Sequence, residues 1–378
     1  MAQTIANPFA ADSTKDARVL SARFRKRHAL EFELNIDLVA SPGFTIVFGA
    51  SGAGKTTLLD SIAGLSTPES GSISVGSRVF FDQRSHLNLH VAQRNVGYVF
   101  QELALFPHLT VEGNIRYGLD RLPAAKREQN ITAILKTFHI APLRQRRPRE
   151  ISGGERQRVA LARSLVTDPC ILLLDEPLAA LDAPTKARIL DDLRRWNEAH
   201  RIPILYVTHS RDEVFALGER VIVLERGRVL AQGTPHEIMG APHQETVAQL
   251  AGFENILDAV VLASHEQRGT MTCRLEGTSV EVETPLVRAE LGEALRIGIR
   301  AGDILLAIQR PEGLSARNVF QGRITSLIRR DVISVAYVNV GVELEVHLTL
   351  AARDALQLKE GKEVWLVVKT HSCHLMAV

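Results

Sequence analysis

The sequence predicts an α/β domain followed by a smaller all-β domain, and three observations support this fold class. Between Phe44 and Leu224, short apolar segments alternate with segments of helical periodicity, as in a parallel sheet covered by helices. A glycine-rich segment, G-A-S-G-A-G-K-T, directly follows the first of these apolar segments. After about Gly252 the pattern changes to short strands separated by turns, which is typical of a small β-barrel.

The composition indicates a soluble globular protein of about two or three domains. The chain has 378 residues, of which 45% are hydrophobic and 23% charged, so it can bury a sizeable core. The formal net charge is only +2, which argues against a partner chosen by charge, such as a nucleic acid. Cys170, Cys273 and Cys373 lie far apart and form no C-x-x-C pair, so we expect no disulfide framework and a reducing compartment.

Residues 1–18 are predicted to be an N-terminal extension. They include Asp12, Lys15 and Asp16 and lack an apolar centre, so we do not expect a signal peptide. No stretch of the chain approaches the roughly 18 uncharged apolar residues that a membrane span needs. If the protein works at a membrane, another chain must hold it there.

The first domain is expected to span residues 19–240. Alternating apolar residues between Val19 and Leu38 predict antiparallel strands, and a helical segment is predicted between Pro123 and Phe138. Two further helices are expected, at Thr56–Ala63 and Glu155–Leu165. Buried strands are predicted at Phe44–Phe48, Val96–Phe100, Ile171–Leu174, Ile204–Thr208 and Val221–Leu224.

Residues 241–258 are predicted to be a linker and residues 259–378 an all-β domain with its core at about 310–378. Turn signals such as Gly302-Asp303 and Gly361-Lys362 separate the expected strands. The expected strands are Ala301–Ile308, Gln321–Leu327, Val332–Val340, Leu344–Leu350 and Val364–Lys369.

The segment Gly49-Ala50-Ser51-Gly52-Ala53-Gly54-Lys55-Thr56, with Thr57 after it, matches G-x-x-x-x-G-K-[ST] and predicts a phosphate-binding loop. Glycines let backbone N–H groups converge on phosphate oxygens, and the helix that follows points its positive end at the same oxygens. Lys55 is expected to contact the β- and γ-phosphates, and the Thr56 hydroxyl to bind Mg²⁺. ATP and Mg²⁺ are therefore the expected ligands.

Two carboxylates end the apolar strand Ile171–Leu174. Asp175 is expected to hold Mg²⁺ and Glu176 to polarise the attacking water as a general base. Two acids at a strand end are common in themselves, and the phosphate loop is what makes this pair informative.

A second glycine-rich segment, Ile151-Ser152-Gly153-Gly154-Glu155, lies just before that strand. With it the chain resembles the ATP-binding-cassette family of P-loop NTPases, whose signature is L-S-G-G-Q, although Ile151 and Glu155 depart from that sequence. The remaining motifs of the family occur in order. Gln101 matches the Q-loop and contacts the metal ion in that family, Asp182 matches the D-loop, and His209 matches the switch histidine. Phe24 is expected to stack on the adenine.

The resemblance implies a cassette with antiparallel and helical subdomains that works in pairs. Each ATP lies between one phosphate loop and the partner's Ser152-Gly153-Gly154 segment. Only one set of motifs is present, so the second copy is expected to be an identical chain. Gln101 then links the nucleotide to two transmembrane permease subunits, at the cytoplasmic face of a bacterial inner membrane. Nucleotide binding and hydrolysis would close and reopen the pair.

Two features resemble molybdate importers in particular. One comprises Val99–Thr110, Gly113–Gly118 and Val207–Ser210 in the first domain. The other is the end of the chain, which resembles the molybdate- and tungstate-binding β-module of molybdenum proteins. A tetrahedral dianion needs a cation and several donors, which Ser315, Arg317 and Lys369 supply if they converge. A periplasmic oxyanion-binding protein is then an indirect partner.

Three alternatives stay open at this point. The β domain can be a structural or dimerising barrel without a bound oxyanion. Importers of sulfate, iron or sugar also carry C-terminal β-barrels, so the barrel alone does not decide the substrate. A soluble cassette ATPase that acts on nucleic acid or ribosomes is disfavoured, because the chain has one cassette and a net charge of +2.

Overall fold

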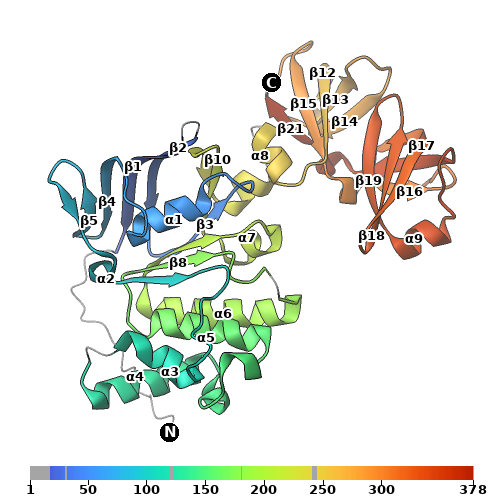
Figure 1. The fold of residues 1–378 in the computed structure, drawn as a ribbon. Coiled ribbons are helices and arrows are strands. Elements are labelled where there is room, and N and C mark those ends of the chain that lie inside the picture. The colour runs from blue at the N-terminus through green and yellow to red at the C-terminus, as the bar shows by residue number, and fades with distance from the viewer. Residues whose placement is uncertain (1–17, 30–31, 120–121, 180, 241–244, 378) are drawn as a thin grey trace, which may run out of the picture. The chain divides into compact units, whose positions relative to one another are not determined.

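The computed structural model describes residues 18–29, 32–119, 122–179, 181–240 and 245–377. The chain divides into two compact units, residues 1–235 and 236–378 (Figure 1). Residues 1–17, most of the predicted N-terminal extension, lie outside the described part. No helix in the described residues is long and apolar enough to cross a membrane.

The first unit contains an 11-stranded sheet in the order β6-β5-β4-β1-β2-β11-β10-β3-β9-β8-β7. Its strands are β1 Leu20–Ala29, β2 Phe32–Ala40, β3 Gly43–Phe48, β4 Ser70–Val75, β5 Arg78–Asp82, β6 Leu87–Asn88, β7 Val96–Val99, β8 Ile171–Asp175, β9 Pro203–Val207, β10 Arg220–Glu225 and β11 Arg228–Gly233. Strands β10, β3, β9, β8 and β7 pair in parallel, whereas β1 pairs antiparallel with β2 and β4. The predicted parallel strands and antiparallel strands are thus confirmed.

Helices cover both faces of the parallel strands. Their bounds are α1 Lys55–Ala63, α2 Val91–Arg94, α3 Val111–Arg116, α4 Ala124–Thr137, α5 Gly153–Leu165, α6 Ala183–His200 and α7 Arg211–Leu217, with short 3₁₀ turns at Tyr117–Leu119, Ala141–Leu143 and Pro148–Glu150. Leu58, Leu59 and Ile62 of α1 share a core with Ile171 and Leu173 of β8. The alternate residues of β8 are also buried and face the other side, where Figure 1 shows α5 and α6.

The second unit begins with a single π-helical turn, His236–Gly240, and helix α8 (Glu245–Leu250). Two five-stranded antiparallel sheets follow, in the orders β14-β13-β12-β15-β21 and β16-β20-β17-β18-β19. The strands are β12 Asn255–His265, β13 Thr270–Leu275, β14 Glu281–Pro285, β15 Ala294–Ile299, β16 Leu305–Ala307, β17 Asn318–Arg330, β18 Ile333–Asn339, β19 Glu343–Thr349, β20 Glu363–Val368 and β21 His374–Ala377, with helix α9 at Leu350–Ala355 and 3₁₀ turns at Glu266–Arg268, Ala301–Asp303 and Thr370–Ser372. One hydrophobic core joins the two sheets.

The predicted boundaries of the second unit need correction. The unit begins at His236 rather than after residue 240, and the predicted linker contains α8 and the start of β12. The start of β12 is hard to predict, because Asn255 is a polar residue in a buried position, with 5% of it exposed. Its side chain donates hydrogen bonds to the carbonyls of Ile299 (3.2 Å) and Glu345 (2.9 Å), so it belongs to the strand and joins the two sheets.

One predicted strand in this unit is shorter than expected. Residues 301–303 form a 3₁₀ turn, and only Leu305–Ala307 of the expected Ala301–Ile308 strand pairs as β16. The turn carries the Gly302-Asp303 pair, which interrupts an extended backbone. The four later strands occur close to their predicted positions.

Candidate functional site

A cleft of about 560 Å³ lies where the carboxyl ends of β3 and β8 meet the start of α1. Its position follows from the parallel pairing, which brings the ends of these strands to one edge of the sheet. Ten residues that the sequence predicts for ATP or metal binding line it together with Phe32: Ser51, Gly52, Gly54, Lys55, Thr56, Thr57, Gln101, Asp175, Glu176 and His209.

Glycines shape the loop between β3 and α1. Gly52 and Gly54 have φ values of +78° and +100°, in the left-handed region that favours glycine. A Cβ atom on Gly54 would also lie 2.9 Å from Cζ of Phe32. Gly54 is the N-cap residue of α1, so the free N–H groups of that helix face the cleft. This is the backbone geometry of an anion site.

Lys55 is held by the loop itself. Its Nζ donates hydrogen bonds to the carbonyls of Gly49 and Ala50, each at 2.9 Å. Burial lowers the pKa of Lys55, and the nearby carboxylates of Glu176 and Asp175 oppose that shift by favouring the ammonium form. A phosphate oxygen in the cleft would meet a positioned cation. Gly49, Ala50 and Ala53 belong to the loop but do not line the cleft.

The acid pair lines the same cleft. Thr56 Oγ1 donates a hydrogen bond of 2.8 Å to Asp175 Oδ2, and burial raises the pKa of Asp175. A hydroxyl and a carboxylate are the oxygen ligands that Mg²⁺ prefers, so this pair fits the ion. Glu176 has a φ of +43°, and its Oε2 lies 3.2 Å from Nδ1 of His209. The two acids therefore face different neighbours.

The signature segment lies outside the cleft. Ser152 is the exposed N-cap residue of α5, and Glu155 accepts from both its N–H (2.7 Å) and its hydroxyl (2.8 Å). These contacts hold the pKa of Glu155 below its usual range. Glu155, which departs from the family signature, thus completes a capping box. Asp182 is likewise exposed and caps α6, accepting from Thr185 N at 2.8 Å.

The prediction that Phe24 stacks on the adenine is wrong. Phe24 pairs with Ile36 in the β1–β2 ladder and is 2% exposed, inside the main hydrophobic core. The aromatic ring at the cleft is that of Phe32, at the start of β2. Phe24 and Phe32 both lie in an alternating apolar pattern. The register of the β1–β2 hairpin decides which of the two rings reaches the cleft. The signal that was available is the position of Phe32 at the end of a strand rather than in its middle.

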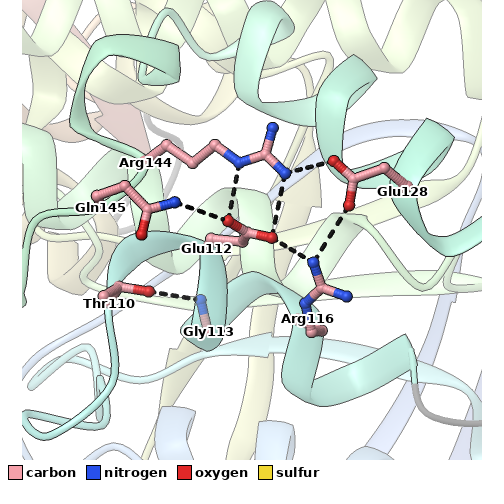
Figure 2. Close-up of polar contacts among 7 residues, drawn as sticks. All are labelled: Thr110, Glu112, Gly113, Arg116, Glu128, Arg144 and Gln145. Atoms are coloured by element: carbon pink, nitrogen blue, oxygen red, sulfur yellow. Dashed lines mark hydrogen bonds and ion pairs between the residues drawn. The ribbon is translucent and has the colours of Figure 1, made fainter. Parts of the chain in front are cut away.

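An ion-pair network joins the chain after Gln101 to the chain before Ser152 (Figure 2). Glu112, in the first turn of α3, accepts hydrogen bonds from Arg144, Arg116 and Gln145, and Glu128 of α4 also pairs with both arginines. The i, i+4 spacing of Glu112 and Arg116 is a local sign of one pair, whereas the pairs of Arg144 with Glu112 and Glu128 join residues 32 and 16 positions apart. The network fixes the loop that leads into the signature segment.

The three residues predicted for an oxyanion are exposed side chains of the second unit. Asn318 pairs with Val368 at the end of the β17–β20 ladder, so Arg317 and Lys369 flank that last pair on the two neighbouring strands. Ser315 lies two residues further along the chain. In the described residues, no group of three or more histidine, cysteine, aspartate or glutamate side chains is arranged to hold a metal.

Comparisons with known proteins agree with this geometry. Residues 34–179 match the ABC transporter family model, and residues 314–375 match the TOBE domain model. The molybdenum import ATP-binding protein ModC of Paramagnetospirillum magneticum is 38% identical over 355 residues, 93% of this chain and 96% of that protein. The ModC protein of Rhizobium meliloti is 40% identical over 341 residues, 90% of this chain and 95% of that one. This chain belongs to the ModC family.

Solved structures support the assignment of the first unit to the ABC cassettes. A dimeric ATP-binding cassette in a post-hydrolysis state with ADP and phosphate is 28% identical, has a TM-score of 0.50 and covers 57% of this chain and 98% of its own. A cassette of the ABC transporter complex cbiONQ of Clostridium perfringens is 25% identical, with a TM-score of 0.53 and coverage of 64% and 96%. As a ModC-family protein, the chain is an ABC-type ATPase followed by a TOBE domain, as the sequence predicts.

Proposed function

We propose that this chain hydrolyses ATP to drive molybdate import, as the nucleotide-binding subunit of a membrane importer. The observation that carries the proposal is the extent of its likeness to proteins named for molybdenum import. Those relatives are 38% and 40% identical across both units, not across the cassette alone. Tungstate has the same charge and shape as molybdate and belongs to the same proposal.

The cleft supports a division of labour in ATP binding. Lys55 would neutralise the β- and γ-phosphates, with the N–H groups of the loop and of α1 around them. Thr56 and Asp175 would hold Mg²⁺, with Gln101, which lines the same cleft, as a further ligand. The bound ion supplies electrostatic stabilisation of the charge that develops on the transferred phosphate. Phe32 would contact the adenine ring of ATP.

Glu176 is proposed as the general base. It lines the cleft at the end of β8, and its contact with His209 orients the carboxylate. A carboxylate at this place accepts a proton from the attacking water. His209 would contact the γ-phosphate and keep Glu176 in position.

A second copy of the chain would complete each site. Ser152, Gly153, Gly154 and Asp182 do not line the cleft of their own chain, and Ser152 and Asp182 are exposed. The start of α5 presents backbone N–H groups that suit a phosphate, beside the capping box of Ser152 and Glu155. A head-to-tail pair places those groups on the partner's ATP. The pair would act on two permease subunits at the cytoplasmic face of the membrane, with a periplasmic oxyanion-binding protein on the other side.

The second unit supports an oxyanion site less directly. Arg317 and Lys369 place two cations at neighbouring positions, and the hydroxyl of Ser315 is close in sequence. Cations and a hydroxyl can supply the charge-assisted hydrogen bonds that stabilise a bound tetrahedral dianion. We propose that these residues bind molybdate or tungstate.

Transport itself is the test of the proposed function. The chain would be expressed with its own permease subunits in a bacterium that lacks its molybdenum-import ATP-binding subunit. Uptake of labelled molybdate should be restored, and Glu176→Gln should abolish it. Restoration of sulfate, iron or sugar uptake in the corresponding deficient strains, with no molybdate uptake, would support the other importers instead.

A further inference from the structure

Glu213 is a buried carboxylate that none of the roles above explains. It lies in the first turn of α7 and is 5% exposed. Its Oε2 accepts hydrogen bonds from the hydroxyls of Thr208 (2.7 Å) and Tyr206 (3.0 Å), and its Oε1 lies 3.0 Å from Nζ of Lys186. Burying an unpaired carboxylate costs free energy of folding, and here the carboxylate is paired on both oxygens. We therefore expect it to have a structural or functional role.

One side of Glu213 braces the segment that carries His209. The Thr208 hydroxyl donates to Glu213 and at the same time accepts from the backbone N–H of Ser210 at 2.9 Å. The residues before and after His209 are therefore held by one hydroxyl. The His209 side chain is 67% exposed and contacts Glu176 Oε2 at 3.2 Å. Since so exposed a ring is little constrained by packing, its backbone must set its position.

The other side of Glu213 reaches the helix that begins at the D-loop. Lys186 lies in the first turns of α6, and its backbone N–H donates to the carbonyl of Asp182 at 2.9 Å. The two carboxylate oxygens of Glu213 thus serve different segments. Oε2 holds the His209 segment, and Oε1 is tied to the helix that Asp182 caps.

We propose that Glu213 is a positioning residue for ATP hydrolysis, which holds His209 against Glu176 through the hydroxyl of Thr208 and is itself anchored by Lys186. The inference rests on the role proposed for His209 in ATP hydrolysis. Glu213 does not line the cleft, so its effect on the reaction would be transmitted through His209. A misplacement of about 1 Å at a catalytic group is enough to cost roughly a hundredfold in rate.

The test compares ATP turnover and ATP affinity of the full-length chain in four variants. Thr208→Val removes the hydroxyl with little change of shape, Glu213→Ala removes the carboxylate, and Lys186→Met removes the anchor. Each should lower kcat, about tenfold to a hundredfold for the first two, and leave the ATP affinity within about twofold. Asp212→Asn is the matched control, because Asp212 is an exposed acid in the same helical turn, and it should leave kcat unchanged.

A double-mutant cycle separates positioning from a general loss of structure. In a His209→Ala background, Thr208→Val should cause no further loss of kcat, because the group through which it acts is gone. An equal loss in both backgrounds would overturn the inference, as would full kcat in Thr208→Val. Thr208→Val keeps the test valid if Glu213→Ala does not fold. Unimpaired turnover in His209→Ala alone would instead refute the role proposed for His209, and this inference with it.

Discussion

Arg144 donates two parallel hydrogen bonds to the carboxylate of Glu112, from Nε to Oε2 at 2.8 Å and from Nη2 to Oε1 at 3.1 Å. The backbone repeats the connection, since Glu112 N donates to the carbonyl of Arg144 at 3.0 Å. The pair ties the first turn of α3 to the loop that leads to Ser152. Planar two-point contacts of this kind are among the stronger ion pairs in proteins.

Replacing Glu112 by Gln should destabilise the first unit by about 1–3 kcal/mol at neutral pH, because Arg144 and Arg116 lose a charged acceptor. The hydrogen bonds and charges of Arg144, and to a smaller extent of Arg116, lower the pKa of Glu112 from 4.5 to about 2. A carboxyl whose folded pKa is depressed contributes stability above its ordinary pKa and loses it as pH falls through the folded value. The stability difference between wild type and Glu112→Gln should therefore be complete at pH 7 and shrink between about pH 4.5 and 2.

Urea unfolding of both proteins across this pH range measures the difference. Gln145→Ala is the control, because it removes only a neutral donor from the same carboxylate (3.1 Å) and should show a smaller, pH-independent effect. A difference that stays constant from pH 7 to pH 3 would show that the charge of Glu112 contributes nothing to stability.

Glu176→Gln should keep ATP binding and abolish turnover. Glutamine preserves the shape and one acceptor oxygen for the contact with His209, but it accepts no proton from water. Fluorescence titration with an ATP analogue gives the affinity, and phosphate release gives the rate. Lys55→Ala is the complementary variant, which should weaken binding itself because a buried cation is removed from the loop. Unimpaired hydrolysis by Glu176→Gln would refute Glu176 as the base.

How far the sequence predicts this structure depends on the distance over which the determining contacts act. The phosphate loop is predictable because one continuous segment has to wrap the anion, and three of its eight residues, Gly49, Gly52 and Gly54, are glycines. The pairing of Glu112 with Arg144 spans 32 residues, and no local pattern encodes it. Asn255 hides the first strand of the second unit, because its partners lie in two other strands. Tertiary contacts, not local preference, decide such positions.

Phe32→Ala should weaken ATP binding by about tenfold without a large loss of stability, because the ring is only partly buried and an aromatic contact contributes about 0.5–1.5 kcal/mol. Phe24→Ala should instead lower stability and leave ATP binding unchanged. It removes a core side chain that is 2% exposed, so it should cost about 3–5 kcal/mol of stability. Phe32→Tyr should retain binding. If Phe32→Ala binds ATP as well as wild type does, Phe32 does not contact the adenine.

Arg94 is fully buried, and it holds the end of the helix that starts at the phosphate loop. Its Nη1 donates to the carbonyls of Ser61 (2.9 Å) and Ile62 (2.8 Å), and its Nε donates to that of Leu89 (3.0 Å). A cation here also complements the negative end of α1. The burial lowers the pKa of Arg94, yet the guanidinium stays charged because arginine titrates far above neutral pH.

Arg94→Met should therefore destabilise the first unit by about 3 kcal/mol or more, because buried carbonyls are left without a donor. The stability of Arg94→Lys should lie between those of Arg94→Met and wild type, since an ammonium keeps the charge but cannot reach all of the carbonyls that the guanidinium spans. Arg84→Met, at an exposed arginine, should change stability by no more than about 0.5 kcal/mol. Chemical denaturation compares the three variants with wild type. If Arg94→Met is as stable as Arg84→Met, the carbonyls at the end of α1 find another donor, and Arg94 does not anchor the helix.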